Sequence, residues 1–159
     1  MICLGLESTA HTFGVGIISS KGEIFADVRD MYQSEKSGII PTEAAAHHKQ
    51  IYHKLIKQAL EQANKKIDLI AYSHGPGLSP CLHVGLQAAK EYAKDLKVPI
   101  IGVNHPAAHL TSGQLFTKTK NPVFLYVSGA NTQIISIEGQ YFRVFGETLD
   151  IGLGNALDK

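Results

Sequence analysis

The stretch ICLGLESTAHTFGVGIIS, residues 2–19, decides the fold of this chain. Ile2–Glu7 alternates in short apolar steps, which is typical of a half-buried strand, and Thr12–Ser19 repeats the pattern. The turn formers SKG at residues 20–22 then separate this segment from a further strand at Glu23–Met31. The sequence therefore begins with a predicted β-hairpin and a third strand.

The same order of elements returns later in the chain. The stretch VFLYVSGANTQIISIE, residues 123–138, predicts a strand at Val123–Ser128 and a hairpin partner at Thr132–Glu138. A turn at residues 139–140 leads to a third strand at Tyr141–Phe145. An internal repeat of this kind indicates two similar lobes that face each other across a cleft. The alternative is a hairpin-rich α/β chain that imitates a repeat by chance.

The segments between the two hairpins predict alternating helices and strands, so the fold class is α/β. Thr42 is expected to cap the first helix, whose apolar residues recur at helical spacing. On that helix His47 and His48 point about 100° apart, so we expect them, with His53, to be surface or interface groups. The expected ranges are a loop at Ser34–Thr42, helices at Glu43–Lys65 and His83–Leu96, strands at Ile67–Ser73 and Pro99–Val103, and a helix that begins near Asn104.

Composition excludes several classes of protein. The formal net charge is +1 with neutral histidines, so no strong overall field attracts the chain to nucleic acid or to a membrane. Cys3 and Cys81 form no CxxC pair, which favours a reducing cytoplasm. Glu7 interrupts the apolar N-terminus, which is therefore no signal peptide, and no stretch approaches the roughly 20 apolar residues of a membrane span. The last residues resemble the start of a helix, and we expect a longer protein.

His105 and His109 are the first candidates for chemistry. Because they are four residues apart on a predicted helix, their rings lie on one face, which is half of a common metal site. The alternative is a chance pair, with one histidine capping the helix and the other in the core. The glutamate of an HExxH zinc-protease motif is absent. Tyr126, in the middle of a predicted strand, is a candidate third ligand, although packing is the commoner role of such a tyrosine.

Several turns offer backbone N–H groups or acidic side chains to a ligand. The two hairpin turns, Glu7–Thr12 and Ser128–Thr132, are rich in small residues and are expected to present N–H groups to a phosphate. Gly75–Gly77 joins a strand to a helix whose N-terminus can hold an anion, although it is not a Walker A loop. Glu147 and Asp150 follow the last predicted strand, and Asp150 and Asp158 lie beside small residues, as a ribose or Mg²⁺ contact requires. The alternative for each is an ordinary turn or loop.

Three longer motifs resemble one family closely. They are GVNHPAAHL at 102–110, LYVSGANTQ at 125–133 and FGETLDIGLGNALD at 145–158. They resemble the TsaD family of tRNA threonylcarbamoyladenosine synthases, and the segments LGLESTAHTFGVGI, EAAAHH and SHGPGL resemble its archaeal and eukaryotic branch. The resemblance implies the actin/Hsp70/sugar-kinase-like (ASKHA) fold. Residues 1–120 would form a first lobe that includes the histidine-bearing helix, and residues 121–159 the start of a second, incomplete lobe.

The resemblance also implies an activity. The family transfers a threonylcarbamoyl group from threonylcarbamoyl-adenylate to N6 of the adenosine that follows the anticodon in tRNAs reading ANN codons. By motif, His105 and His109 match ligands of its iron or zinc ion, and Tyr126 matches a tyrosine at the metal and substrate. The implied partners are tRNA and, in the archaeal KEOPS complex, a small protein kinase and a dimerisation subunit. The residues that match the contacts to the adenylate or to ATP are Tyr126, Val127, Ser128, Gly129, Ala130, Asn131 and Asp158.

Weaker candidates for the same site come from the other turns. They are Glu7, Ser8, Thr9, Gly75, Gly77, Glu147 and Asp150. Because members of the family are longer and have their last metal aspartate in a part absent here, we expect this chain alone to be inactive. The competing hypotheses are a non-catalytic nucleotide-binding paralogue or scaffold and, far behind it, a metalloprotease, which would lack a general base within the histidine motif.

Overall fold

The chain divides into two compact units, Met1–Pro106 and Ala107–Lys159. The division falls within helix α3 (His105–Thr117), ahead of the lobe boundary expected between residues 120 and 121. The computed structural model describes residues 1–34, 38–117, 119–128, 131–139 and 141–157.

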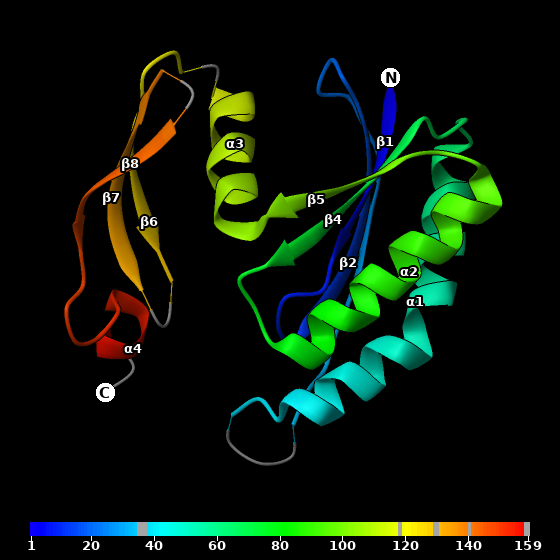
Figure 1. Cartoon of the computed structure of the whole chain (residues 1–159), viewed down its shortest axis with the longest axis horizontal. Coiled ribbons are helices and arrows are strands. Elements are labelled where there is room, and N and C mark those ends of the chain that lie inside the picture. The colour runs from blue at the N-terminus through cyan, green and yellow to red at the C-terminus, as the bar shows by residue number, and fades with distance from the viewer. Residues whose placement is uncertain (35–37, 118, 129–130, 140, 158–159) are drawn as a thin grey trace. The chain divides into compact units, whose positions relative to one another are not determined.

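A five-stranded mixed sheet forms the centre of the first unit (Figure 1). Its strands are β1 (Ile2–Glu7), β2 (Thr12–Ser19), β3 (Ile24–Met31), β4 (Leu69–Gly75) and β5 (Ile100–Asn104). They lie in the order β3-β2-β1-β4-β5. The first three form an antiparallel meander, whereas β4 and β5 run parallel to β1. The hairpin and third strand predicted from the start of the sequence are confirmed.

Two helices, α1 (Pro41–Ala63) and α2 (Ser79–Leu96), cover one face of this sheet. α1 packs on β2 and β3, α2 packs on β4, and the helices pack against each other. Their buried stripes and the inner face of the sheet form one hydrophobic cluster. The largest apolar side chains at its centre are Leu4, Phe13, Ile17, Ile56 and Ile70, each 0% exposed.

Both helices begin earlier in the chain than the sequence predicts. α1 starts at Pro41, and the residue before it, Ile40, makes no side-chain capping bond, so the expected cap at Thr42 is wrong. α2 starts at Ser79 rather than at His83. Each helix has a proline in its first turn, where the missing N–H has no intrahelical partner to lose and the fixed φ angle already suits a helix.

The second unit contains a three-stranded antiparallel sheet and a short helix. They are β6 (Val123–Val127), β7 (Thr132–Glu138), β8 (Tyr141–Glu147) and α4 (Leu153–Leu157). The order β6-β7-β8 repeats the meander β1-β2-β3. In both meanders the register shifts between the second and third strands, at Ile17/Ile18 and at Ile134/Ile135. The second meander predicted from the sequence is therefore confirmed.

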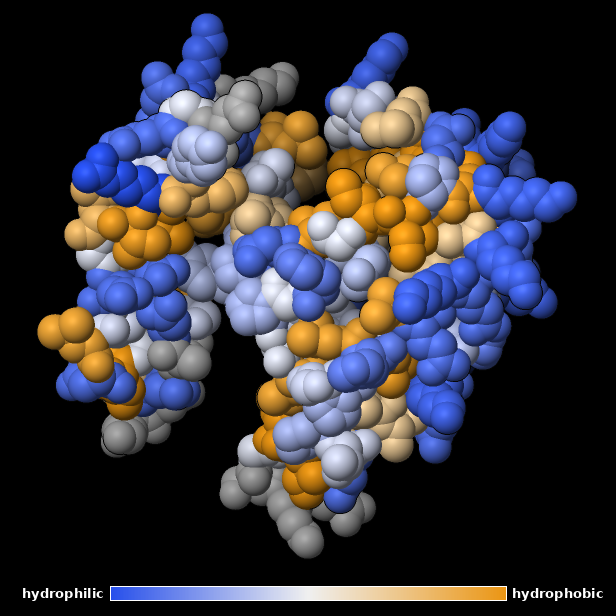
Figure 2. Space-filling view, in the orientation of Figure 1, coloured by the Kyte–Doolittle hydropathy of each residue, from blue (hydrophilic) through white to orange (hydrophobic). Residues whose placement is uncertain are grey.

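Large apolar side chains of the second unit lie at its surface. Figure 2 shows such side chains exposed on this unit, and Val123, Leu125 and Phe145 are each at least 60% exposed. Ile135 of β7 is buried. Among the residues described, the principal hydrophobic core therefore belongs to the first unit. This core supports the turn between β1 and β2.

Candidate functional site

The carboxyl ends of three parallel strands meet at one edge of the first unit's sheet. β1 ends at Glu7, β4 at Gly75 and β5 at Asn104, and β4 pairs in parallel with both of the others. Ligands of α/β proteins commonly bind outside this edge of a sheet. The β1–β2 turn, residues 8–11, leaves the sheet at the same edge. The predicted site residues of β1, of its turn and of the end of β4 therefore lie together.

Glu7 connects this turn to the first histidine of the predicted metal pair. Its Oε2 lies 3.0 Å from Nδ1 of His105, whose side chain is 23% exposed. Its Oε1 accepts hydrogen bonds from the backbone N–H of Thr9, at 2.7 Å, and from the Thr9 hydroxyl. Both carboxylate oxygens are therefore engaged. A carboxylate on one imidazole nitrogen fixes the orientation of the ring, an arrangement that is common behind metal-binding histidines.

The start of the turn is held by β4 and α2. The Ser8 N–H donates to Oγ of Ser73 on β4 at 3.2 Å, and the Leu78 N–H donates to the carbonyl of Thr9 at 2.7 Å. A Cβ atom on Gly77 would lie 2.6 Å from the same Thr9 carbonyl oxygen. Glycine is therefore required at 77 by the close approach of this backbone to the turn, which gives it a packing role whether or not an anion binds.

Ser8 is fully buried beneath α2. A Cβ atom on Gly85 of α2 would lie 2.0 Å from the Ser8 Oγ, so helix and turn are in contact here. Within the described part of the chain this Oγ has no hydrogen-bond partner. A buried hydroxyl without a partner costs about 1–3 kcal/mol, so the serine is not explained by stability.

The end of the turn is held by α1 and by the residue that follows β3. Nε2 of His48 lies 2.9 Å from the carbonyl oxygen of Ala10, and the Tyr32 N–H donates to the carbonyl of His11 at 2.8 Å. Together with the bonds described above, every residue from 8 to 11 has a main-chain group bonded to a neighbouring element or to Glu7. The turn is therefore held in one conformation from several sides.

His48 is buried, so its expected surface position is wrong. Its side chain is 0% exposed, and its ring meets the ring of Phe13 edge-on at 5.6 Å between centroids. The physical reason is helical periodicity, since His48 continues the buried stripe formed by Ala44 and Tyr52. Burial lowers the pKa of His48, and the hydrogen bond to the Ala10 carbonyl opposes this only in part. His53, whose side chain is 56% exposed, lies at the surface as expected.

We expect the protein to become less stable as the pH falls, partly because of His48. Its folded-state pKa lies below the ordinary value of about 6.5. As the pH drops below about 6.5, the unfolded chain binds a proton that the folded chain does not, so the free energy of unfolding decreases until the folded pKa is reached. Melting temperatures between about pH 7.5 and about pH 5 measure this slope. A His48→Gln variant should show a shallower slope, and an unchanged one would contradict this assignment.

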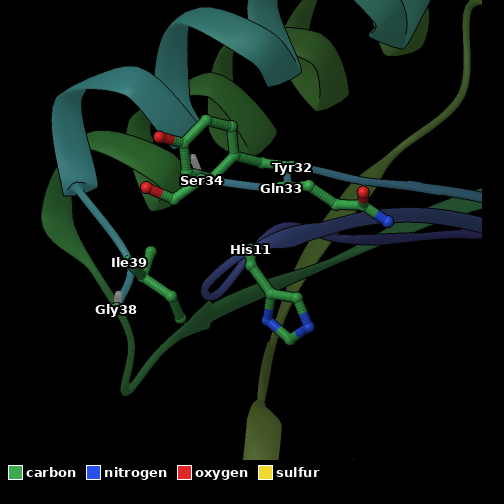
Figure 3. A pocket seen from close by; sticks show the side chains of 6 residues that line it. All are labelled: His11, Tyr32, Gln33, Ser34, Gly38 and Ile39. Atoms are coloured by element: carbon green, nitrogen blue, oxygen red, sulfur yellow. The ribbon is translucent and has the colours of Figure 1, made fainter. Parts of the chain in front are cut away.

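An open pocket of about 530 Å³ lies beside the turn (Figure 3). Figure 3 shows His11, from the turn, on one side of it and Tyr32 and Ser34, which follow β3, on the other. The Tyr32 hydroxyl donates a hydrogen bond to the carboxylate of Glu43 on α1. Gln33, Gly38 and Ile39 complete the lining. The lining thus combines an imidazole, a phenol, a hydroxyl, an amide and an aliphatic side chain.

In the second unit, His109 and Tyr126 lie near each other. Their ring centroids are 6.2 Å apart, with 48° between the ring planes. Tyr126 of β6 pairs with Gln133 of β7, which pairs with Glu147 of β8, so these three side chains share one face of the sheet. The Gln133 Nε2 donates to Oε2 of Glu147 at 3.0 Å. The second unit thus brings His109, a predicted metal ligand, near Tyr126, a predicted substrate contact. Tyr126 shares its face of the sheet with the Glu147 carboxylate.

The second hairpin turn is closed by its own hydrogen bonds. The Ser128 N–H and hydroxyl both donate to the carbonyl of Asn131 at 2.8 Å, and the Asn131 N–H donates back to the Ser128 Oγ at 3.0 Å. Thr148 Oγ1 donates to Oδ1 of Asn131 at 3.1 Å. The N–H of Ser128 is therefore occupied within the turn and does not face a phosphate in this conformation. The neighbouring Gly129 and Ala130 lie outside the described residues.

The remaining residues that were predicted to contact a ligand are Val127, Asp150 and Asp158. Val127 ends β6 and is 45% exposed. Asp150 is exposed, and its Oδ1 accepts a hydrogen bond from the Ile151 N–H at 2.8 Å, which is an ordinary loop arrangement. Asp158, the predicted nucleotide-contacting aspartate, lies outside the described residues.

Two features are absent from the described residues. Over residues 1–34, 38–117, 119–128, 131–139 and 141–157, no group of three or more His, Cys, Asp or Glu side chains is placed to hold a metal ion. In the same part of the chain, no helix is both long enough and apolar enough to cross a membrane.

Sequence reasoning missed three residues that shape these turns. His48 could have been found by extending the apolar stripe of α1 one turn toward its N-terminus. Ser73 ends the apolar core of β4, and its hydroxyl also donates to the Leu6 carbonyl at 3.3 Å, a bridge that only the strand pairing reveals. Thr148 binds the second hairpin turn from a distant segment, and no local pattern predicts that contact.

Two archaeal proteins are similar to this chain over essentially its whole length. The "Probable bifunctional tRNA threonylcarbamoyladenosine biosynthesis protein" of Methanocaldococcus jannaschii is 53% identical over 160 residues, which are 100% of this chain and 30% of that protein. The "tRNA N6-adenosine threonylcarbamoyltransferase" of Thermococcus kodakarensis is 51% identical over 161 residues, which are 99% of this chain and 49% of that protein. The chain thus spans about half the length, or less, of these curated relatives.

Solved structures confirm the expected fold class. YeaZ from Pseudomonas aeruginosa superposes with a TM-score of 0.60 at 15% identity, covering 96% of this chain and 69% of that chain. A ROK family glucokinase from Streptomyces griseus, solved with glucose and AMPPNP, superposes with a TM-score of 0.57 at 11% identity, covering 90% of this chain and 46% of that chain. At these identities the likeness concerns the fold alone, which is that of the actin-like and sugar-kinase proteins.

The sequence itself identifies the family. The family model described as "TsaD: tRNA N6-adenosine threonylcarbamoyltransferase" matches residues 23–159, which include the three motifs at 102–110, 125–133 and 145–158. The match and the two archaeal relatives agree with the motifs around the histidine pair and the second hairpin turn. This chain belongs to the TsaD family.

Proposed function

We propose that the full-length protein transfers a threonylcarbamoyl group from threonylcarbamoyl-adenylate to N6 of the adenosine following the anticodon in ANN-decoding tRNAs. Membership of the TsaD family and the name of the Thermococcus relative support this activity. The structural observation that carries it is the 3.0 Å contact between Glu7 and Nδ1 of His105. It prepares an imidazole for a cation at the edge of the sheet where α/β proteins bind ligands.

The metal ion that this family implies fits the residues present. His105 and His109 lie one helical turn apart on α3, and neutral imidazole is a good ligand for both iron and zinc. The carboxylate behind His105 matches the arrangement commonly found behind metal-binding histidines. We propose that these two histidines bind the ion, with Tyr126 as a further contact. When bound, it would polarise a carbonyl or phosphoryl oxygen of the substrate.

The chain's own residues then mainly position the reactants. The donor is already activated as an adenylate, so the remaining task is to bring amine and carbamoyl carbon together. Glu7 orients His105, and the anchored β1–β2 turn keeps Glu7 in place. Tyr126 would contact the substrate from the face that it shares with Glu147.

We assign the adenylate, or ATP, to the second hairpin turn and its surroundings. Since Ser128 uses its N–H to close the turn, we expect the ligand to meet other groups of this segment. The closed turn supplies a fixed scaffold for them. The proposed contacts are Val127, Ser128, Gly129, Ala130, Asn131 and Asp158, with Ser8, Thr9, Gly75, Gly77 and Asp150 as secondary candidates.

The proposed partners follow from the activity and the family. tRNA is the substrate, and we propose a small protein kinase and a dimerisation subunit as the other members of a KEOPS complex in the cytoplasm. The word "bifunctional" in the name of the Methanocaldococcus relative is consistent with a second activity joined to that protein. We further propose that residues 1–120 and 121–159 belong to the two lobes of the complete enzyme.

A reconstituted transfer reaction tests the proposal. The full-length protein with its partner subunits is mixed with threonylcarbamoyl-adenylate and a tRNA that reads an ANN codon, and the nucleosides are analysed by mass spectrometry. We expect the modified adenosine to form with this tRNA and not with one that has guanosine at the acceptor position. Metal-loaded, folded protein that yields no modified nucleoside would favour a non-catalytic paralogue instead.

A further inference from the structure

The buried imidazole of His48 has a defined hydrogen-bonding state. A carbonyl oxygen can only accept, so the 2.9 Å contact with Ala10 requires a proton on the His48 Nε2. Since burial lowers the pKa of His48, the ring is neutral near pH 7 and its Nδ1 is an acceptor. Nδ1 of His47 lies 3.4 Å from this Nδ1, and Nε2 of His47 lies 3.2 Å from Oδ1 of Asp30.

The ring has no freedom to move away from the turn. It is 0% exposed, and Phe13 of β2 packs edge-on against it at 5.6 Å between centroids. The ring of His47 also lies close, at 5.7 Å between centroids and 63° between the ring planes. A donor fixed in the core in this way sets the position of its acceptor, because moving the Ala10 carbonyl would leave a buried N–H unpaired.

Ala10 lies in the turn between Glu7, which contacts a candidate metal ligand, and His11, which lines an open pocket. Glu7, on one side, holds His105, and His11, on the other, lines the open pocket seen in Figure 3. The neighbouring anchors are the Leu78 N–H on the Thr9 carbonyl and the Tyr32 N–H on the His11 carbonyl. The Ala10 carbonyl is thus held from α1 between anchors that come from α2 and from the end of β3.

We infer that His48 is a positioning residue for the transfer reaction. Its Nε2–H fixes the Ala10 carbonyl and with it the turn that places Glu7 against His105 and His11 at the pocket. The inference rests on the proposed function for its catalytic consequence, but the effect on the turn is independent of it. His48 touches neither substrate nor metal in this assignment, and acts only through the backbone of the turn.

Two substitutions separate the hydrogen bond from the bulk of the ring. His48→Gln keeps an N–H donor close to the position of Nε2, whereas His48→Leu fills the site without a donor. The matched control is Tyr52→Phe, which removes a buried hydrogen bond to Glu91, at 2.9 Å, from the same helix and the same core without a bond to the turn. If the leucine variant does not fold, His48→Asn, whose amide is too short to reach Ala10, takes its place.

The variants are compared in the full-length protein by three measurements. Amide hydrogen exchange reports on the peptide that contains residues 8–12, zinc titration reports on the affinity of the histidine pair, and steady-state kinetics separate kcat from KM. For His48→Leu we expect faster exchange in this peptide, weaker zinc binding and a kcat about ten- to hundred-fold lower, with KM for tRNA little changed. His48→Gln should recover most of each loss, and Tyr52→Phe should change none of them beyond its effect on melting temperature.

The outcomes distinguish this inference from the proposed function. If His48→Gln is no better than His48→Leu, or if Tyr52→Phe has equal effects, His48 is a structural core residue and the inference is wrong. If exchange and zinc affinity respond as expected but the unaltered protein transfers nothing, the positioning of the turn stands and the proposed function fails.

Discussion

His109→Ala in the full-length protein is expected to lose its bound transition metal. The two imidazoles that we assign to the ion are those of His105 and His109 on α3, so removal of one ring leaves too few protein ligands for tight binding. Alanine is the best helix former, so α3 should persist and the loss should be local. Elemental analysis after dialysis, together with zinc titration, measures the change in stoichiometry and affinity.

The chain offers a matched control and an intermediate case. His83 is exposed on α2, and its Nδ1 lies 2.7 Å from the carbonyl oxygen of Ser79. His83→Ala removes this imidazole and should leave the metal content unchanged. Glu7→Ala leaves both histidines but removes the carboxylate behind His105, and affinity should fall by about ten- to hundred-fold. Unaltered metal stoichiometry and affinity in His109→Ala would remove the assignment of this histidine as a ligand.

Phe13→Ala is expected to have the largest effect on stability. Phe13 is 0% exposed and its ring contacts those of His48 and Tyr52, so truncation leaves a cavity between β2 and α1. Such a change in a packed core costs about 3–5 kcal/mol. The midpoint of chemical denaturation, followed by a probe in the first unit, measures it.

The control for this prediction is the same substitution at an exposed position. Phe145 of β8 is 60% exposed in the second unit, and Phe145→Ala should change the free energy of unfolding by less than about 0.5 kcal/mol. Equal losses at the two positions would mean that the cluster around Phe13 is not the dominant core. A larger loss at Phe145 would mean that the exposed apolar side chains of the second unit are covered in the full-length protein.

Local pattern was sufficient for most of the strands and helices. Both meanders could be predicted because alternation and turn residues are local properties of Ile2–Met31 and Val123–Glu147. The helix starts were misplaced because a proline can occupy the first turn without a side-chain cap, as Pro41 does. Spacing alone selected His105, but not its partner Glu7, since that contact joins segments 98 residues apart.

The burial of His48 shows where single-residue reasoning failed. A histidine beside another histidine was interpreted by its polarity, whereas its place on the stripe with Ala44 and Tyr52 determined its environment. The turn contacts of Ser73 and Leu78 depend on strand order and on helix packing, which no local motif encodes. Family motifs supplied the roles of His109 and Tyr126, and these roles stay predictions until metal and substrate binding are measured.

The way in which the β1–β2 turn is anchored has a consequence for folding. The turn and Glu7 are synthesised before all of their partners, which are Tyr32, His48, Ser73, Leu78 and His105. Contacts between such distant positions form slowly, because long loops must close before any of them is gained. We therefore expect the β1–β2 turn to stay unstructured during folding until β5 has joined the sheet. Nascent chains that end before His105 should accordingly have a loose tip that proteases can cut, and longer ones a resistant tip.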